Sequence, residues 1–552
     1  MMPTTTGDGE PPRDARNAPR IVTLLTALII ATAKERRILI RRSRLRRRLD
    51  RRPGGVPAAV PFLVLMSLVL VLGPAGCSDA KDGRAEPRKT VPAKKPNIVF
   101  VLTDDLSWNL VAHMPQVRDM QARGLTFDNF FVADSLCCTS RSTILTGKYP
   151  HNTGVRTNFP PDGGYEVFKA HGGEQSAFGA GLQKAGYRTA FLGKYLNGYQ
   201  PGDTQGGATP YVPPGWSEWY VTGNGYPEYN YNLNENGRLV RYGQAPQDYL
   251  TDVLSGKAND FVQRAADARQ PFFMEVATFA PHGPFVPAPR HAAVLPGVRA
   301  PRSPSFNEPD VRDKPSWLRS HPRLRKPGLR AIDNGFRDRA RMVQAVDEMI
   351  ARLRQTLAAK GLDRDTYLVF GSDNGFHMGE HRLAGGKMTA FDTDIRVPYV
   401  VVGPGVQAGR RTGALVQNTD LAPTFLDLAG APVPPATDGR SLVPFLRGTE
   451  PAGWRNVALI EHVKPRPTAE DPDRQDSAPG APPTYNALRL RDALYVEYQD
   501  GEREFYDLVR DPHQLANQGG RLPPDRQRQL SALLYALTHC SGAGCASAGR
   551  TR

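Results

Sequence analysis

Short apolar segments recur along the chain, and each is followed by polar residues capable of chemistry. The segments read NIVFVL at 97–102, YRTAFLG at 187–193, FFMEVATFAP at 272–281 and TYLVFGS at 366–372. Such short runs, rich in β-branched and aromatic residues, predict strands that are buried on both faces. Residues 338–361 have apolar positions three and four apart, which predicts an amphipathic helix. This alternation predicts an α/β fold with a mainly parallel sheet between two layers of helices.

The residues that end these segments can meet, because the carboxyl ends of parallel strands lie at one edge of a sheet, where ligands bind. Adjacent carboxylates repel each other unless a cation is near, and carboxylate and amide oxygens suit Ca²⁺ or Mg²⁺. Each position taken alone also has an ordinary explanation as a turn or a helix cap. The residues concerned are Asp104, Asp105, Lys194, His282, Asp373 and Asn374.

The chain changes character after about residue 455. Residues 485–508 alternate apolar and polar positions and contain Asp500-Gly501, which predicts a β-hairpin that turns there. The preceding segment, 465–484, is Pro-rich and of low complexity, which predicts a loop. The sequence contains no internal repeat, phosphate-binding loop or nucleic-acid motif.

The net charge of +16 over 552 residues would suggest a nucleic-acid partner, but its distribution argues against one. Residues 1–52 hold fourteen Lys or Arg against five Asp or Glu, and residues 53–95 hold six against three, which leaves only +4 for the rest. A hydrophobic content of 40% is enough for a sizeable core. We therefore expect a folded protein with a basic N-terminal segment and no nucleic-acid partner.

The N-terminal segment is typical of an export signal. A basic flank precedes an apolar run at 60–72, and GPAGCS follows, which includes Cys77. This box resembles that of bacterial lipoproteins, although Pro74 stands where Leu is usual. A single transmembrane anchor and plain secretion are the alternatives. We expect residues 1–77 to direct export and residues 78–95 to form a polar tether.

Five cysteines occur, and two of them are adjacent. Cys540 and Cys545 can pair in an oxidising compartment. The Cα atoms of neighbouring residues lie about 3.8 Å apart, below the roughly 4.4 Å at which ordinary disulfides begin, so Cys137 and Cys138 are not expected to pair. Neither belongs to a CxxC metal-binding spacing. The adjacent pair therefore needs another explanation.

Residues 137–151, CCTSRSTILTGKYPH, resemble the signature of type I sulfatases, in which the cysteine of C-x-P-S-R-x-x-x-L-T-G is oxidised to formylglycine. The motifs TDD, GKYLNGY, PGWSEWY, YNYNLNENG, DYLTDVL, FAPHGPF, DNGF and DIRVP occur in the order found in the N-acetylglucosamine-6-sulfatases of that family. The resemblance makes Cys137 the modified residue. It implies an alkaline-phosphatase-like catalytic domain at 96–450, a C-terminal subdomain at 455–540 with a small antiparallel sheet and a closing helix, and a tail at 541–552.

The resemblance also implies roles by position. A divalent cation is expected, with Ca²⁺ preferred and Mg²⁺ as the alternative, beside formylglycine at position 137. The implied metal ligands are Asp104, Asp105, Cys137, Asp373 and Asn374. The implied catalytic residues are Cys137, Arg141, Lys194, His282 and Lys387. The residues expected to line the substrate pocket are His151, Asn197 and His381.

The implied reaction is hydrolysis of a sulfuric ester on a sugar, specifically the 6-O-sulfate of N-acetylglucosamine units. One hydroxyl of a formylglycine hydrate attacks sulfur and releases the alcohol, and the other lets sulfate leave by C–O cleavage. The implied partners are a sulfated saccharide and a formylglycine-generating enzyme, and we expect an exported protein attached to a membrane through its N-terminus. A phosphoester hydrolase of the same superfamily and an inactive glycan-binding lipoprotein are the alternatives.

Two positions depart from the family pattern. Thr139 replaces the Pro or Ala that the maturation machinery reads, which bears on the conversion of Cys137. Many sulfatases have histidine at the position of Leu196. The N-acetylglucosamine-6-sulfatases also have leucine there, and Asn197 is expected to supply the hydrogen bond that the histidine would make. Thr139 and Ser140 are also good capping residues for a helix that begins after Cys137.

Residues 286–330 form a Pro-rich segment with ten Lys or Arg against three Asp or Glu. Because the segment closely follows His282, we expect it to border the active-site mouth and attract a sulfated polysaccharide. The alternative is an arginine-rich surface segment without such a role.

Overall fold

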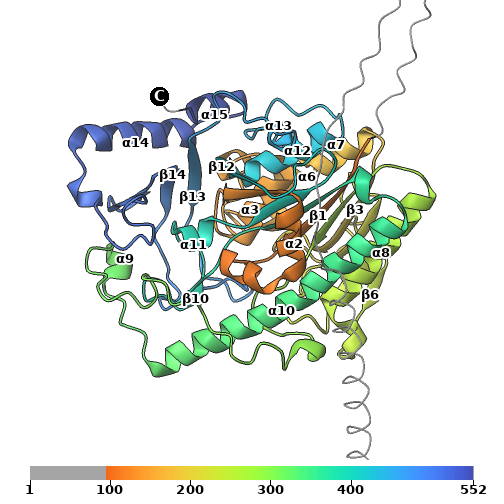
Figure 1. Ribbon diagram of the computed structural model, residues 1–552, viewed down its shortest axis with the longest axis horizontal. Coiled ribbons are helices and arrows are strands. Elements are labelled where there is room, and N and C mark those ends of the chain that lie inside the picture. Colours follow the sequence, from red (N-terminus) through yellow and green to blue (C-terminus); the bar gives the residue numbers. More distant parts are fainter. Residues whose placement is uncertain (1–94, 551–552) are drawn as a thin grey trace, which may run out of the picture. The chain divides into compact units, whose positions relative to one another are not determined.

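A ten-stranded sheet organises the computed structural model, which describes residues 95–550 (Figure 1). Four parallel strands lie side by side at its centre in the order β8-β1-β7-β3. They coincide with the four apolar segments, which confirms the expected mainly parallel sheet. The central strands are β1 (Asn97–Thr103), β3 (Arg188–Lys194), β7 (Phe272–Ala277) and β8 (Thr366–Ser372).

The sheet continues beyond β8 with β11, β2 and β12, and beyond β3 with β4, β5 and β6. Strand β11 is antiparallel to both of its neighbours, and β5 and β6 form an antiparallel edge. These strands are β2 (Leu125–Phe131), β4 (Glu218–Thr222), β5 (Asn232–Glu235), β6 (Leu239–Arg241), β11 (Tyr399–Val402) and β12 (Arg410–Gln417).

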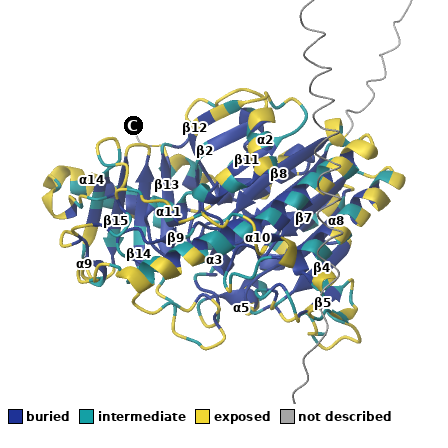
Figure 2. Ribbon diagram, turned by 60° about the horizontal axis from the view of Figure 1, so that its bottom comes forward, coloured by how far each residue is buried: buried dark blue, intermediate teal, exposed yellow. Residues whose placement is uncertain are grey.

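Side chains of the central strands alternate between two cores. Ile98 and Phe100 of β1 belong to one core, and Val99 and Val101 belong to the other. Helices α3, α7 and α12 pack over the first face, and α2, α8 and α10 over the second. In Figure 2 the strands are mostly buried, whereas exposed residues gather on outer surfaces such as those of α2 and α8. These helices are α2 (Pro115–Arg123), α3 (Cys137–Thr146), α7 (Phe178–Lys184), α8 (Leu250–Asp267), α10 (Lys326–Ala359) and α12 (Leu421–Leu428).

Helix α10 begins twelve residues before the helix expected at 338–361. Pro327 lies in the first turn of α10, where a backbone N–H has no acceptor within the helix. The N–H that proline lacks is therefore not missed at this position. The Pro-rich composition before residue 330 therefore concealed the start of a long helix.

A four-stranded antiparallel sheet forms the C-terminal part, as expected. The turn at Asp500-Gly501 joins β15 to β16, and a second tight turn at Arg491-Asp492 joins β14 to β15. The alternation of apolar and polar residues did not reveal the second turn, because both strands keep the same period across it. The strands and the closing helix are β13 (Val457–His462), β14 (Tyr485–Leu490), β15 (Ala493–Tyr498), β16 (Arg503–Asp507) and α14 (Pro524–Thr538).

The two sheets share a core. Val457 and Leu459 of β13 pack with residues of α14, whereas Ala458 and Ile460 belong to the same hydrophobic cluster as Phe100 of β1. The C-terminal sheet is therefore attached to the main sheet by a continuous apolar interior.

Short elements complete the chain. The helices are α4 (Pro150–Thr153), α5 (Gly164–Ala170), α6 (Gly173–Ser176), α9 (Ser316–Arg319), α11 (Asp392–Ile395), α13 (Val443–Leu446) and α15 (Ala543–Ala548), and the strands are β9 (His377–Met378) and β10 (Gly385–Gly386). The 3₁₀ helices are η1 (Trp108–His113), η2 (Pro246–Asp248), η3 (Pro289–His291), η4 (Asp363–Asp365), η5 (Asn418–Asp420) and η6 (Gly519–Arg521). Within residues 95–550, no helix has the length and apolar composition needed to cross a membrane. The expected export signal and most of the tether lie outside the described residues.

A buried ion pair should contribute strongly to the attachment of the C-terminal sheet. Arg455, just before β13, donates to both oxygens of Asp420, and neither side chain is more than 5% exposed. Replacing Asp420 by Ala leaves a buried guanidinium without its carboxylate, so we expect Asp420→Ala to lower the free energy of unfolding by about 3–5 kcal/mol in a denaturant titration. Asp128→Ala, which breaks the exposed pair with Arg411, is the control and should cost less than about 1 kcal/mol. Equal losses in the two variants would contradict this role.

Candidate active site

The carboxyl ends of the four central strands converge on a buried cluster of charged side chains. Asp104 and Asp105 follow β1, Lys194 ends β3, Asp373 follows β8, and His282 lies in the segment after β7. All five are at most 4% exposed. They come together because these strands are parallel neighbours.

Cys137, the first residue of α3, lies within this cluster. Its Sγ is 3.3 Å from Asp104 Oδ1 and 4.0 Å from Asp105 Oδ1. Lys387, which follows β10, donates its Nζ to the sulfur at 2.7 Å and to Asp105 Oδ1 at 2.6 Å. Burial raises the pKa of the Cys137 thiol well above its ordinary value, and Asp104 raises it further. The unmodified side chain is therefore a neutral thiol and a poor nucleophile.

Two more cations compensate the carboxylates. Lys194 Nζ lies 2.6 Å from Asp104 Oδ2, and Arg141 Nε lies 2.9 Å from Asp373 Oδ2. Arg141 also donates to the carbonyl oxygen of Lys194 at 2.8 Å, which joins α3 to β3. Burial by itself would lower the pKa of Lys194, but Asp104 outweighs burial and raises the pKa well above its ordinary value. Lys194 therefore remains a cation despite its burial.

The donor atoms around Asp105 suit a hard divalent cation. One ligand atom each from Asp104, Asp105, Cys137 and His282 lies within 4.8 Å of the others. Asn374 donates its Nδ2 to Asp105 Oδ1 at 2.6 Å, but its Oδ1 is buried without a hydrogen-bond partner among the described residues. A buried oxygen without a partner is costly, and coordination to a cation would remove that cost. The side chains present are therefore compatible with a bound metal ion.

Asp373 is arranged differently from these ligands. Its Oδ1 accepts the backbone N–H groups of Asp105 and Asn374 at 3.1 and 2.8 Å, and its Oδ2 accepts from Arg141. Burial raises the pKa of Asp373 to about 7, and Asp104 contributes to the increase. Both oxygens are engaged by the protein, so its role as a metal ligand stays a prediction.

His282 is held between two acceptors. Its Nδ1 lies 2.6 Å from the carbonyl oxygen of Gly283, and its Nε2 lies 2.7 Å from Asp473 Oδ1. Each contact requires a proton on the ring, so the hydrogen-bond partners assign an imidazolium. Burial alone would lower the pKa of His282, but Asp105 and the neighbouring carboxylates outweigh it and raise the pKa. A protonated ring at this position can act as a general acid.

Asp473 is a member of the cluster that the sequence did not reveal. It lies in the 465–484 loop, where its Oδ1 also accepts from Lys387 Nζ at 2.8 Å and its Oδ2 accepts from Asn158 Nδ2 at 2.8 Å. Burial would raise the pKa of Asp473, but Lys387 and His282 hold it well below its ordinary value. Nothing in the Pro-rich composition distinguishes this aspartate from its neighbours, because only tertiary packing brings it to the site.

Asn197 lies beside the cluster, and His381 is directed elsewhere. Asn197 Nδ2 donates to Tyr226 Oη at 3.4 Å, and the Tyr226 ring centroid is 4.9 Å from Lys194 Nζ. His381 Nδ1 instead bonds Glu308 Oε2 at 2.7 Å. The structure therefore places His381 against Glu308 and the ring of Phe391, outside the charged cluster.

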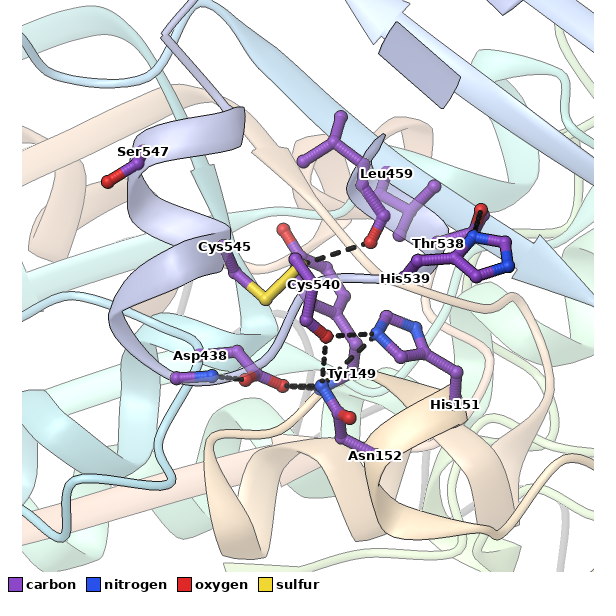
Figure 3. The surroundings of a disulfide bond; sticks show 12 residues. Tyr149, His151, Asn152, Asp438, Leu459, Thr538, His539, Cys540, Cys545 and Ser547 are labelled. Atoms are coloured by element: carbon purple, nitrogen blue, oxygen red, sulfur yellow. Dashed lines mark hydrogen bonds between the residues drawn. A yellow bond between two sulfur atoms is a disulfide. The ribbon is translucent and has the colours of Figure 1, made fainter. Parts of the chain in front are cut away.

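The structure does not bring His151 into the cluster either. Figure 3 shows His151 and Asn152 both directed at the carbonyl oxygen of Cys540, which forms a disulfide with Cys545. The other ring nitrogen of His151 bonds Glu461 Oε2 at 2.8 Å. Helix α3 has ten residues and is about 15 Å long, and it separates His151 from the residue that starts the helix. Proximity in the sequence was therefore misleading.

The expected caps of α3 are replaced by long-range contacts. Neither Thr139 nor Ser140 caps the helix, and both are fully buried. Ser140 Oγ donates to the carbonyl oxygen of Asp373 at 2.5 Å, and Asn158 Oδ1 accepts the N–H of Cys138 at 3.1 Å. A distant side chain thus supplies the acceptor that a local cap would provide.

A pocket of about 450 Å³ opens onto the cluster. Its lining combines site residues, aromatic rings and the 465–484 loop, but includes no residue from 286–330. Several arginines of that basic segment pair with carboxylates from elsewhere, such as Arg290 with Asp252. Residues 286–330 are therefore better described as an arginine-rich surface segment than as a border of the active-site mouth. The lining includes Asp105, Tyr226, His282, Phe285, Phe376, Lys387, Asp473 and Arg474.

Comparison with known proteins identifies the family. Residues 96–431 match the sulfatase family model, and residues 379–527 match the model of the N-sulphoglucosamine sulphohydrolase C-terminal region. Human N-acetylglucosamine-6-sulfatase is 34% identical over 525 residues, which cover 90% of this chain and 92% of the human protein. The chain belongs to the sulfatase family.

Solved structures share the fold of the chain. One is an enzyme in complex with its substrate D-glucosamine-2-N,6-O-disulfate, with 25% identity, a TM-score of 0.64 and coverage of 80% of this chain and 97% of that one. A phosphonate monoester hydrolase from Silicibacter pomeroyi, with 22% identity and a TM-score of 0.60 over 79% of this chain and 93% of that one, shares the fold.

Metal removal should destabilise the sulfatase. We expect chelation with EDTA to lower its melting temperature and added Ca²⁺ to restore it, because a ligand at 100 times its Kd stabilises a folded protein by about 2.7 kcal/mol. Asp105→Asn should lose this response, which differential scanning fluorimetry measures. Asp119→Asn, at a partly exposed position of α2 where the carboxylate pairs with Arg123 and Arg354, is the control and should keep it. A Ca²⁺ response of equal size in both variants would place the cation elsewhere.

A buried glutamate behind the sulfatase site should make stability depend on pH. Glu275 of β7 is 2% exposed, its Oε2 lacks a partner among the described residues, and burial raises its pKa to about 8 although Arg141 opposes the increase. Between about pH 4.5 and 8 the folded state holds a proton that the unfolded state has lost, so stability falls as pH rises through this window.

We expect the isosteric variant Glu275→Gln to remove that part of the pH dependence and to raise the free energy of unfolding at pH 8 by about 2–4 kcal/mol. Denaturant titrations at pH 5 and pH 8 measure both effects. A variant with the same slope against pH as the parent would show that Glu275 is ionised in the folded protein.

Proposed function

We propose that this sulfatase hydrolyses the 6-O-sulfate ester of N-acetylglucosamine units in sulfated saccharides, with Cys137 converted to formylglycine and with Ca²⁺ as the preferred cation. The observation that carries the proposal is the position of Cys137. It starts α3 at the carboxyl edge of the sheet, within reach of Asp104, Asp105 and Lys387.

The surrounding cations suit an anionic ester. Beside the side chain of residue 137, Asp104 pairs with Lys194 and Arg141, and Asp105 pairs with Lys387. These three cations can therefore hold the sulfuryl oxygens as negative charge develops on them. Cys137 is the first residue of α3, so the positive end of the helix dipole also lies beside the residue-137 side chain. Burial strengthens each of these interactions, because little solvent screens them.

The remaining chemistry involves His282, a formylglycine at position 137 and a divalent cation. A formylglycine hydrate at position 137 would supply the attacking hydroxyl, and a cation held by Asp104, Asp105 and Asn374 would stabilise charge on the sulfuryl oxygens. His282 carries a proton on Nε2 at the pocket wall, where it can protonate the departing sugar oxygen. Its Nδ1 contact with Gly283 holds the ring in that orientation.

The relatives support the choice of sugar. The human relative is an N-acetylglucosamine-6-sulfatase, and the substrate of the solved neighbour is a glucosamine with a 6-O-sulfate. The pocket of about 450 Å³ accommodates a sugar unit, and its wall includes Tyr226 and Phe285. We also propose export, with residues 1–77 as the signal and with attachment to a membrane through the N-terminus.

Maturation requires access to a residue that the fold conceals. Cys137 and Thr139 are both 0% exposed, so a formylglycine-generating enzyme must act on the chain before the domain closes. Thr139 in place of Pro or Ala then affects recognition of the unfolded segment, not the geometry of the folded site. If conversion failed, the chain would remain an inactive glycan-binding protein.

Mass spectrometry and activity test the proposal together. After co-expression with a formylglycine-generating enzyme, we expect the tryptic peptide that contains Cys137 to lose about 18 Da. The enzyme should then release sulfate from N-acetylglucosamine-6-sulfate and from 4-nitrocatechol sulfate. Cys137→Ala should abolish both activities, whereas Cys138→Ala, one residue along, should retain them. An unmodified peptide in an active enzyme would overturn the mechanism.

A phosphoester hydrolase of the same superfamily remains the alternative, because the fold is shared with a phosphonate monoester hydrolase. Comparing kcat/KM for 4-nitrophenyl sulfate and 4-nitrophenyl phosphate separates the two functions. The proposal requires the sulfate ester to be the better substrate.

A further inference from the structure

Asp473, in the 465–484 loop, bonds His282 and Lys387, the two residues that the proposed reaction needs to bind the sulfate ester and release the sugar. Asp473 Oδ1 lies 2.7 Å from His282 Nε2 and 2.8 Å from Lys387 Nζ, and its side chain is 5% exposed. The second oxygen accepts from Asn158. Three donors from distant parts of the chain therefore surround this carboxylate, as donors surround a bound anion.

The same donors cannot serve Asp473 and a substrate at once. His282 has its Nδ1 committed to the carbonyl oxygen of Gly283, so Nε2 is the ring atom left to protonate a leaving group. That atom now donates to Asp473. Lys387, the second donor, also faces residue 137, where an ester must approach. Binding of a sulfate ester therefore requires Asp473 to move away.

Charge points in the same direction. Asp473 adds a fourth carboxylate to those of Asp104, Asp105 and Asp373 in this buried cluster. An entering sulfate ester brings its own negative charge into a buried space. Retaining both anions there would be costly, because buried like charges repel strongly.

The loop is built so that it can shift. Residues 465–484 form no helix or strand and contain no Leu, Ile, Val, Met or aromatic residue, so little apolar burial holds them in place. Their anchors are polar contacts, such as those of Gln475 with the backbone of Lys387 and of Asp471 with Asn158. Loop residues also line cavities of about 80, 300 and 450 Å³, which leave space around them.

We propose that Asp473 is an internal anion of the sulfate site: it occupies, in the ligand-free enzyme, the donors that the sulfate group of a substrate takes, and the 465–484 loop moves when the two exchange. This inference rests on the proposed function for the identity of the entering anion. It makes Asp473 a residue that sets the affinity for sulfated ligands, although it lies outside the four central strands.

Hydrogen–deuterium exchange of the mature, Ca²⁺-loaded enzyme tests the movement, with inorganic sulfate as the probe. Saturating sulfate should make peptides from 465–484 exchange about threefold faster or more, because the loop loses its contacts, while peptides from α3 become slower. A ligand that merely adds contacts protects the segments around it. Protection of the 465–484 loop by sulfate would overturn the proposal.

Calorimetric titration with sulfate tests the competition. Asp473→Ala should bind sulfate about tenfold more tightly than the parent, since no internal anion must be displaced. Asp471→Asn is the matched control: it removes one negative charge two residues away, leaves Asp473 in place, and should change the Kd by less than about twofold. Equal changes in the two variants, or the absence of sulfate binding in all of them, would overturn the proposal.

Failure of this inference is distinguishable from failure of the proposed function. An enzyme that hydrolyses sulfate esters but shows neither loop exposure nor tighter binding in Asp473→Ala would refute the internal anion alone. Tighter sulfate binding in Asp473→Ala without any ester hydrolysis by the mature enzyme would leave the anion exchange standing and refute the activity.

Discussion

Compensation of buried opposite charges at the carboxyl edge of the sheet is the constraint on which this site depends. Lys194 bonds Asp104, Lys387 bonds Asp105, and all four side chains are at most 3% exposed. An isolated charge at such a position would be very costly, so each group is tolerated only because its partner is present. The parallel sheet brings Asp104, Asp105 and Lys194 to one edge, and Lys387 reaches the same place from β10, outside that sheet.

This edge of the sheet could be predicted from the sequence because each buried strand and the polar residue at its end are adjacent along the chain. An apolar run that stops at Asp104 or Asp373 reports both a buried strand and the chemistry at its end. That these strand ends meet then follows from the rules of parallel sheets, whereas the strand order β8-β1-β7-β3 is known only from the structure. Cys137 was identified for another reason, the resemblance of its surroundings to a known signature. No periodicity or spacing argument would have selected it.

The residues that prediction misplaced or missed depend on tertiary contacts that no local pattern encodes. His151 follows the signature in sequence, but the intervening helix carries it to the C-terminal disulfide. Asp473 enters the site from a loop whose composition indicates only a flexible connection. Asn158 similarly replaces the caps expected at Thr139 and Ser140. In each case the decisive partner is a group brought in from a different part of the fold.

The strand-end residues and the residues of the 465–484 loop differ in how freely they can be replaced. In the proposed mechanism the strand ends and Cys137 carry the reaction, and the charge compensation around them leaves little freedom to vary these residues singly. The 465–484 loop is held in two ways. Its backbone oxygens accept from His321, His377 and Ala384, which leaves the side chains at those loop positions free to vary, whereas Asp471, Asp473 and Gln475 bond residues outside the loop through their side chains. Substrate affinity can therefore change through the loop while the chemistry stays fixed, which is how one fold accommodates different esters. The shared core of the two sheets holds β13 and β14, which flank this loop, against the strands that carry the site.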